Sequence, residues 1–202
     1  MIRRVDFLSA LAIGALAGLL MLAIGRTLAL PSGLDAFLLW LPFVFPAATL
    51  SVMTAGAVAS ARFGFLYQLT KFALVGGLNF LIDLGVLTLL IAATGIASGF
   101  YADAFKGASF LVAMSSSFLW NKFWTFRALS TADAGKQFAG FFAVTLGGFF
   151  INVGVFALLN WLGPLGLPPP AWASIAAGGA AIAGLIWNFL GYKFFVFRRA
   201  DA

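Results

Sequence analysis

Residues 117–127 read SFLWNKFWTFR, and residues 188–198 read NFLGYKFFVFR. The two stretches align without a gap, and both carry the pattern Lys-Phe-aromatic-x-Phe-Arg, which begins at Lys122 and at Lys193. Further upstream, residues 80–86 (FLIDLGV) align with residues 149–155 (FFINVGV). Self-similarity at a regular spacing indicates an internal structural repeat. The sequence therefore predicts one helical hairpin that is used twice.

The composition is that of a membrane protein. Of the 202 residues, 63% are hydrophobic and 9% are charged, and the mean hydropathy is +1.06. Soluble domains carry roughly 25% charged residues, so this chain cannot cover a surface that faces water. Apolar stretches of about 20 residues cross a bilayer as helices. The sequence contains six such stretches, at residues 5–25, 36–60, 72–94, 104–120, 138–162 and 171–189.

The basic residues predict the orientation, because cytoplasmic loops are enriched in Lys and Arg. With both termini in the cytoplasm, the outside holds only Arg26 and Lys106, and Lys106 is expected to anchor the outer boundary. In this orientation both repeated hairpins start on the cytoplasmic side, so they are parallel repeats. Between the first two apolar stretches, a turn is expected at residues 30–33 (LPSG). The cytoplasmic side holds Arg3, Arg4, Arg62, Lys71, Lys122, Arg127, Lys136, Lys193, Arg198 and Arg199.

The residue types present exclude several kinds of chemistry. The chain has no Cys, no His and no Glu, which removes disulfides, zinc sites, Cys or His nucleophiles and the usual proton shuttle. We therefore expect no enzyme activity, no metal site and no cofactor. The net charge of +6 is best explained by contact with anionic membrane lipids, and no nucleic-acid partner is expected.

Asp83 is the most informative single position. It follows Lys71 by 12 residues, which places it roughly 18 Å into the membrane at about 1.5 Å per residue. A carboxylate there costs about 2.5–3.5 kcal/mol, so it should face the bundle interior or a wet cavity. Two readings stay open: a substrate or ion pathway, and hydrogen bonding between packed helices. The helix face of Asp83 also holds Gly76 and Asn79, and the matching face of the second hairpin holds Thr145, Gly148 and Asn152.

A second cluster lies at the ends of the two repeated motifs. Each end combines basic residues with an asparagine and aromatic residues. Taken singly, these are ordinary membrane anchors in an aromatic belt. Placed together, they would form a basic rim that grips a phosphate through charge-assisted hydrogen bonds. The rim would comprise Asn121, Lys122 and Arg127 from one motif, and Asn188, Lys193, Arg198 and Arg199 from the other.

Three stretches together resemble the GtrA-like family: residues 71–83 (KFALVGGLNFLID), 117–126 and 188–197. The resemblance covers about residues 67–199 and implies a four-helix membrane domain at residues 66–202. The transmembrane hairpin at residues 1–65 is then an addition to the family core. One departure is Tyr192, where family members often have Asn. The fold class expected is an all-α integral membrane protein with six transmembrane helices.

The resemblance implies a role in cell-surface polysaccharide synthesis at the cytoplasmic (inner) membrane. GtrA-like proteins are thought to translocate polyprenyl-phosphate-linked sugars, and similar domains anchor dolichol- or polyprenyl-phosphate glycosyltransferases. The implied partners are a polyprenyl-phosphate lipid or its sugar conjugate, a glycosyltransferase and a second copy of the chain. Two alternatives stay open: a membrane anchor that recruits a glycosyltransferase, and a small cation exporter that uses Asp83. The resemblance assigns the substrate site to Asn79, Asp83, Asn121, Lys122, Asn188 and Lys193.

Overall fold

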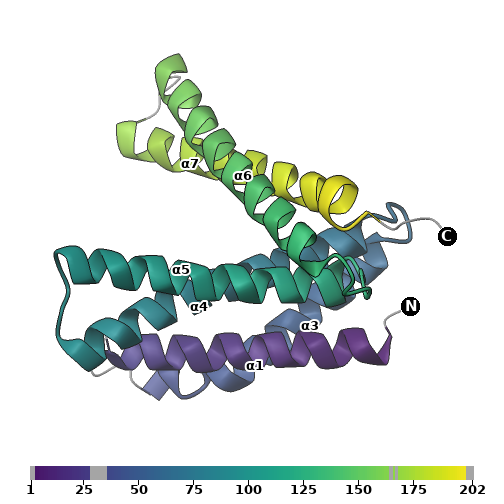
Figure 1. Ribbon diagram of the computed structural model, residues 1–202, viewed down its shortest axis with the longest axis horizontal. Coiled ribbons are helices and arrows are strands. Elements are labelled where there is room, and N and C mark those ends of the chain that lie inside the picture. The colour runs from purple at the N-terminus through teal and green to yellow at the C-terminus, as the bar shows by residue number, and fades with distance from the viewer. Residues whose placement is uncertain (1–2, 28–35, 164–165, 167, 199–202) are drawn as a thin grey trace. The chain divides into compact units, whose positions relative to one another are not determined.

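The computed structural model describes residues 3–27, 36–163, 166 and 168–198, and within these ranges the chain is helical and has no strand. Two five-residue π-helices, η1 (Asn121–Thr125) and η2 (Tyr192–Val196), directly continue α5 and α7. The expected turn at residues 30–33 and the basic residue Arg199 lie outside the described residues. The long helices are α1 (Arg4–Thr27), α3 (Leu41–Ala59), α4 (Leu66–Thr94), α5 (Phe100–Trp120), α6 (Ala134–Leu162) and α7 (Pro169–Gly191) (Figure 1).

Five helical segments in the described part of the chain are long and apolar enough to cross a membrane: α1, α3, α4, α6 and α7 with its π-helix. Large apolar side chains such as Phe43 and Phe149 point outward, as they do when lipid is the solvent. An all-α multi-pass membrane protein is therefore confirmed. Helix α5 has 21 residues but carries Asp103, Lys106 and three consecutive serines, and it is not among the five. The sixth span and the sidedness of the termini stay predictions.

The observed helix boundaries extend beyond the apolar stretches at some ends and fall short at others. Helix α4 begins at Leu66 rather than at residue 72, and α6 at Ala134 rather than at residue 138. Hydropathy misses these first turns because they contain polar residues such as Gln68. Such residues are nevertheless good helix formers, so the helix extends through them. Helix α3 begins late, at Leu41, with a proline in its first turn, which is where a helix accepts one.

Residues 1–127 form one compact unit, in which α1 and α3 approach closely through two glycines. A Cβ added at Gly14 would lie 2.5 Å from the Pro46 Cα, and one at Gly18 would lie 2.5 Å from the Leu41 carbonyl oxygen. This Gly-x-x-x-Gly spacing permits close helix contact in membranes. The Thr49 hydroxyl also donates a hydrogen bond to the Ala10 carbonyl at 2.9 Å. The N-terminal hairpin is therefore a tightly packed pair.

The N-terminal hairpin packs against α4, the first helix of the repeat. Val75 and Leu78 of α4 are 0% and 2% exposed. They lie in a core that includes residues from α1, α3, α4 and η1. This core joins the N-terminal hairpin to the first repeated hairpin. Its buried members are Ala10, Ile13, Ala17, Met53, Val75, Leu78, Leu81 and Trp124.

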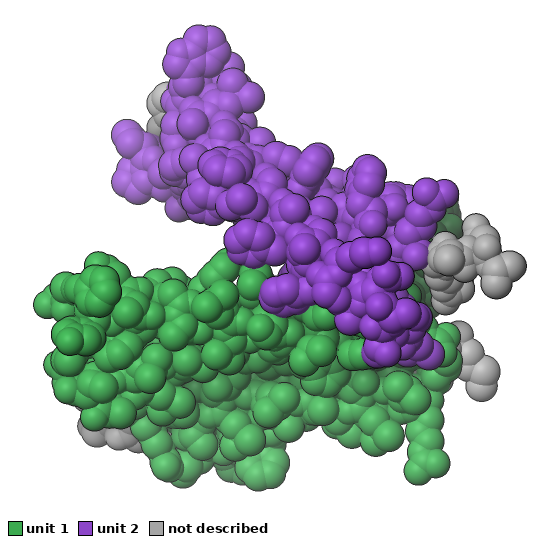
Figure 2. Space-filling model, viewed as in Figure 1, with its two compact units in different colours: residues 1–127 green, residues 128–202 purple. Residues whose placement is uncertain are grey.

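Residues 128–202 form the second compact unit, drawn in purple in Figure 2. In it, two indole groups of α7 donate hydrogen bonds to carbonyl groups of α6. Trp187 Nε1 lies 3.0 Å from the Val144 oxygen, and Trp172 Nε1 lies 3.1 Å from the Leu159 oxygen. These bonds fix the register of the α6–α7 hairpin along most of its length.

The two hairpins share local structure as well as sequence. Each ends in a five-residue π-helix, at Asn121–Thr125 in the first and Tyr192–Val196 in the second. In the first hairpin the rings of Phe72 and Phe126 lie 6.4 Å apart, and the matching rings of Phe141 and Phe197 lie 6.2 Å apart. The repeat predicted from the sequence is therefore present in the fold of each hairpin.

Candidate functional site

The first unit has one end that is rich in basic side chains. It is formed by the start of α1, the start of α4 and the π-helix η1, and we call it the basic end. Gln68 of α4 donates to the Thr125 carbonyl at 3.3 Å, which ties η1 to α4. The charged, amide and indole side chains that concern us there are Arg3, Asp6, Lys71, Asn121, Lys122, Trp124 and Arg127.

The π-helix at the basic end changes where its side chains point. The Phe126 amide donates to the Asn121 carbonyl at 2.8 Å, and in the second unit the Phe197 amide donates to the Tyr192 carbonyl at 2.8 Å. A π-turn inserts one extra residue into a helix and often marks a functional site. The π-helix ends at Thr125, and Arg127, two residues further on, has a φ of 56°, which lies in the left-handed region. Sequence reasoning missed the π-helices, although their place in both repeated motifs was a signal.

Lys122 and Asn121 both lie on η1 and are withdrawn from water. Each is 1% exposed. The Lys122 ammonium lies 5.6 Å from the centre of the Phe123 ring. The Asn121 amide nitrogen donates to the Ser117 carbonyl at 3.0 Å, while its carbonyl oxygen has no partner among the residues described. The motif thus presents a buried cation next to a vacant hydrogen-bond acceptor.

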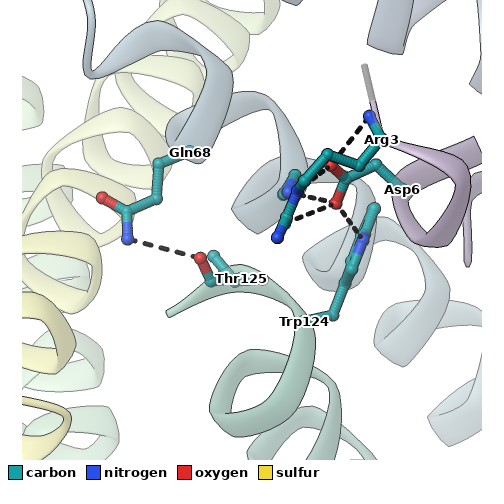
Figure 3. Close-up of polar contacts among 6 residues, drawn as sticks. Arg3, Asp6, Gln68, Trp124 and Thr125 are labelled. Carbon is teal, nitrogen blue, oxygen red and sulfur yellow. Dashed lines mark hydrogen bonds and ion pairs between the residues drawn. The ribbon is translucent and has the colours of Figure 1, made fainter. Parts of the chain in front are cut away.

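Asp6 lies at the centre of the basic end and is 0% exposed. Lys71 Nζ lies 2.5 Å from its Oδ1, Trp124 Nε1 donates to the same oxygen at 3.2 Å, and Arg3 Nε donates to Oδ2 at 3.0 Å. Figure 3 shows the Asp6 carboxylate facing the Arg3 side chain and the Trp124 indole. The Lys71 ammonium also lies 4.5 Å from the centre of the Tyr67 ring, a cation–π distance.

Sequence reasoning did not place Asp6 or Lys71 in a site. The signal that could have found them is a carboxylate inside an apolar helix, because such a group needs a partner. The partner that is local in sequence, Arg3, lies only three residues away. The other partners lie 65 and 118 residues away along the chain, beyond the range of any local pattern.

Asp83 lies on α4 and is paired across the α4–α5 contact. Its carboxylate forms an ion pair with Lys106 and accepts a hydrogen bond from the Ser109 hydroxyl at 2.6 Å. Its side chain is 24% exposed. Lys106 thus neutralises Asp83, and its place at the outer boundary stays a prediction. One turn earlier, buried Asn79 donates to the Val75 carbonyl at 2.7 Å, and its own side-chain oxygen lacks a partner among the described residues.

The second unit holds the remaining predicted site residues. Asn188 packs on Gly148, where an added Cβ would lie 2.3 Å from the asparagine Oδ1, and this buried oxygen has no partner in the described part of the chain. Lys193 lies half-buried between aromatic rings, and Arg198 is exposed. Asn152 is half-buried where α6 meets Gly184 of α7.

Tyr192 takes the place that Asn121 has in the first motif. Its ring stacks on Phe141 at 4.2 Å between centroids, and its hydroxyl lies 2.6 Å from the Thr145 hydroxyl. Thr145 belongs to the expected polar face of α6, and it is now bonded within its own hairpin. The two motifs are therefore alike in backbone but different in the chemistry of this position.

Residues 71–197 match the family model described as GtrA/DPMS, transmembrane domain. The chain belongs to this family. Neither a curated protein nor a solved structure matches it. The GtrA-like resemblance is thus confirmed, and it makes the chain a GtrA-like membrane protein of glycan-related processes. Transmembrane domains of this family are generally non-catalytic.

The GtrA/DPMS match begins at Lys71, so the basic end has two origins. Lys71, Asn121, Lys122 and Trp124 belong to the family domain, whereas Asp6 comes from the preceding hairpin. Within the first unit, the structure brings Asn121, Lys122 and Arg127 together on and next to η1. Asn79 and Asp83 lie further along α4, and that the residues of both units share one rim stays a prediction.

Proposed function

We propose that this GtrA/DPMS protein translocates polyprenyl-phosphate-linked sugars across the cytoplasmic membrane during cell-surface polysaccharide synthesis. The observation that carries the proposal is the pair of neighbours on η1: a lysine ammonium and a vacant asparagine acceptor, both 1% exposed. A phosphate can bind the lysine ammonium through charge-assisted hydrogen bonds. Sugar hydroxyl groups can donate hydrogen bonds to the asparagine oxygen.

The substrate path in this proposal follows the predicted site residues. The phosphate binds Lys122 and Lys193, with Arg127 and Arg198 as outer basic residues that attract it. The sugar hydroxyl groups donate to the side-chain oxygens of three asparagines and, further along, pass the polar groups of Asp83 and Asn152. The polyprenyl tail stays in lipid, so only the headgroup needs a polar path. The three asparagines are Asn79, Asn121 and Asn188.

Several parts of the proposal rest on the sequence. Six transmembrane helices, cytoplasmic termini and a family domain at residues 66–202 follow from hydropathy, charge and motif. Four core helices enclose little space, so the working form is proposed to include a second copy or a glycosyltransferase partner.

The test is headgroup transfer in vesicles that contain the purified protein and a fluorescent polyprenyl-phosphate sugar. Lys122→Ala is expected to slow transfer at least about tenfold, because it removes the charge-assisted contact. The control is Lys136→Ala, since Lys136 is exposed and its ion pair is with the exposed Asp133. Normal transfer by Lys122→Ala would refute this mechanism.

A second candidate is a membrane anchor that recruits a polyprenyl-phosphate glycosyltransferase. It is favoured by exposed aromatic rings on the π-helices, with Phe123 43% and Phe195 82% exposed, because aromatic and basic residues together suit a protein contact. Co-purification of a glycosyltransferase, together with no transfer by the isolated protein, would favour it. The cation exporter is disfavoured, because the Asp83 carboxylate already has Lys106 as its cation.

A further inference from the structure

The environment of Asp6 has the make-up of an anion site. Four side-chain N–H groups converge on its carboxylate: Arg3 Nε at 3.0 Å, Arg3 Nη2 at 3.2 Å, Lys71 Nζ at 2.5 Å and Trp124 Nε1 at 3.2 Å. They come from the start of α1, from α4 and from η1. One carboxylate thus faces more cationic charge than it can neutralise.

We propose that Arg3, Lys71 and Trp124 form a binding site for a phosphomonoester, and that the Asp6 carboxylate occupies this site until the phosphate displaces it. This inference rests on the proposed function for its lipid ligand. Charge-assisted donors in a fixed arrangement recognise phosphate and carboxylate alike. In the resting protein, Asp6 therefore imitates the ligand.

The charge of the ligand decides whether it can displace Asp6. A phosphomonoester carries about −1.5 to −2 at neutral pH, whereas a carboxylate carries −1. A sugar-linked phosphate is a diester and carries only −1, so it gains nothing over Asp6. The site therefore favours the free carrier phosphate, which remains after the sugar has been removed, over the loaded carrier.

An approach to the site exists at Arg3. Its side chain is 40% exposed, whereas those of Lys71 and Asp6 are 4% and 0% exposed. A phosphate can contact Arg3 first and then replace Asp6 at Lys71 and Trp124. Asp6 lies in the first turn of α1, so the exchange requires that this turn move away from Lys71 and Trp124.

The experiment measures binding of geranylgeranyl phosphate to the full chain in detergent, with its methyl diester and inorganic phosphate as comparison ligands. The wild-type chain should bind the monoester more tightly than the diester. Asp6→Asn keeps an acceptor for Lys71 but removes the competing charge, and it should bind the monoester about tenfold more tightly. Asp133→Asn, at an exposed ion pair, is the matched control and should change nothing.

Lys71→Met makes the test independent of how well Asp6→Asn folds. Lys71→Met should weaken monoester binding at least about tenfold relative to wild type. The double variant Asp6→Asn with Lys71→Met should not recover the wild-type affinity for the monoester. A folded Asp6→Asn variant with unchanged affinity, or Lys71→Met with wild-type affinity, would overturn the proposal and leave Asp6 as a structural clamp. Inorganic phosphate binding as tightly as the lipid would support the site but assign it to a soluble phosphate.

The inference and the proposed function can fail separately. If Lys122→Ala abolishes transfer while Asp6→Asn leaves the affinity unchanged, only the inference fails. If no variant transfers headgroups but the Asp6 and Lys71 variants behave as stated, the phosphate site stands and translocation fails.

Discussion

Asn79, Asn121 and Asn188 each keep a buried side-chain oxygen without a partner in the described part of the chain. Leaving such an acceptor unsatisfied costs about 1–3 kcal/mol, and buried polar groups are otherwise nearly always bonded. All three were predicted as site residues from the sequence. A substrate with hydroxyl groups would explain why this cost is tolerated.

Replacing Asn121 by Leu tests this explanation. The side chains have similar size, and the change removes an unsatisfied acceptor, so thermal stability should stay unchanged or rise by about 1 kcal/mol. Headgroup transfer should fall about tenfold if the oxygen receives a sugar hydroxyl. The control is Asn160→Leu at the exposed end of α6. Loss of stability in Asn121→Leu, as measured by thermal unfolding in detergent, would mean that the amide is structural.

Arg127 allows backbone strain to be separated from charge. Its φ of 56° costs a residue with a side chain about 1–2 kcal/mol, while glycine and asparagine accept this region readily. Arg127→Asn should therefore keep stability, and Arg127→Val should lower it by about 1–2 kcal/mol. Both variants remove the charge equally. If phosphate-lipid binding falls equally in both while only the second is less stable, Arg127 acts through its charge.

At the scale of elements, hydropathy located the helices but could not locate their contacts. The stretch at residues 138–162 lies within α6 because apolar length reports where a helix crosses lipid. Apolar length could not show the polar first turn at Ala134. It could not show the π-helices either, because a π-helix differs from an α-helix in its backbone hydrogen bonds and not in its hydropathy. The pairing of Asp6 with Lys71 was equally out of reach, because it depends on how α1 packs against α4.

The close contact between α1 and α3 gives a prediction at this scale. Gly14→Ala would bring a Cβ to 2.5 Å from the Pro46 Cα, so the helices must separate, and the unfolding free energy should fall by about 1–3 kcal/mol. Gly76→Ala is the matched control, because nothing lies within 4 Å of its added Cβ. That change should be neutral or stabilise the helix by about 1 kcal/mol. Equal stabilities of the two variants would contradict the observed contact.

At the scale of the whole molecule, the N-terminal hairpin and the first repeated hairpin form one compact unit, although the family domain begins only at Lys71. The sequence predicted a boundary at residue 65 because the motifs stop there. It could not show that Asp6 and the core around Val75 cross that boundary. Apolar contacts alone would hold the hairpin weakly, because lipid replaces them at little cost. The buried ion pair has no such replacement.

This difference predicts how a divided chain behaves. When residues 1–65 and 66–202 are co-expressed as separate chains, they should co-purify, because the contacts of Asp6 with Lys71 and Trp124 do not need the covalent link. Asp6→Ala in the first fragment leaves Lys71 buried without its carboxylate, a change that costs about 3–5 kcal/mol, and co-purification should be lost. Adding Lys71→Met to the second fragment removes the uncompensated charge and should restore much of the association. Failure of this rescue, with both fragments present in the membrane, would show that helix packing and not the ion pair holds the hairpin in place.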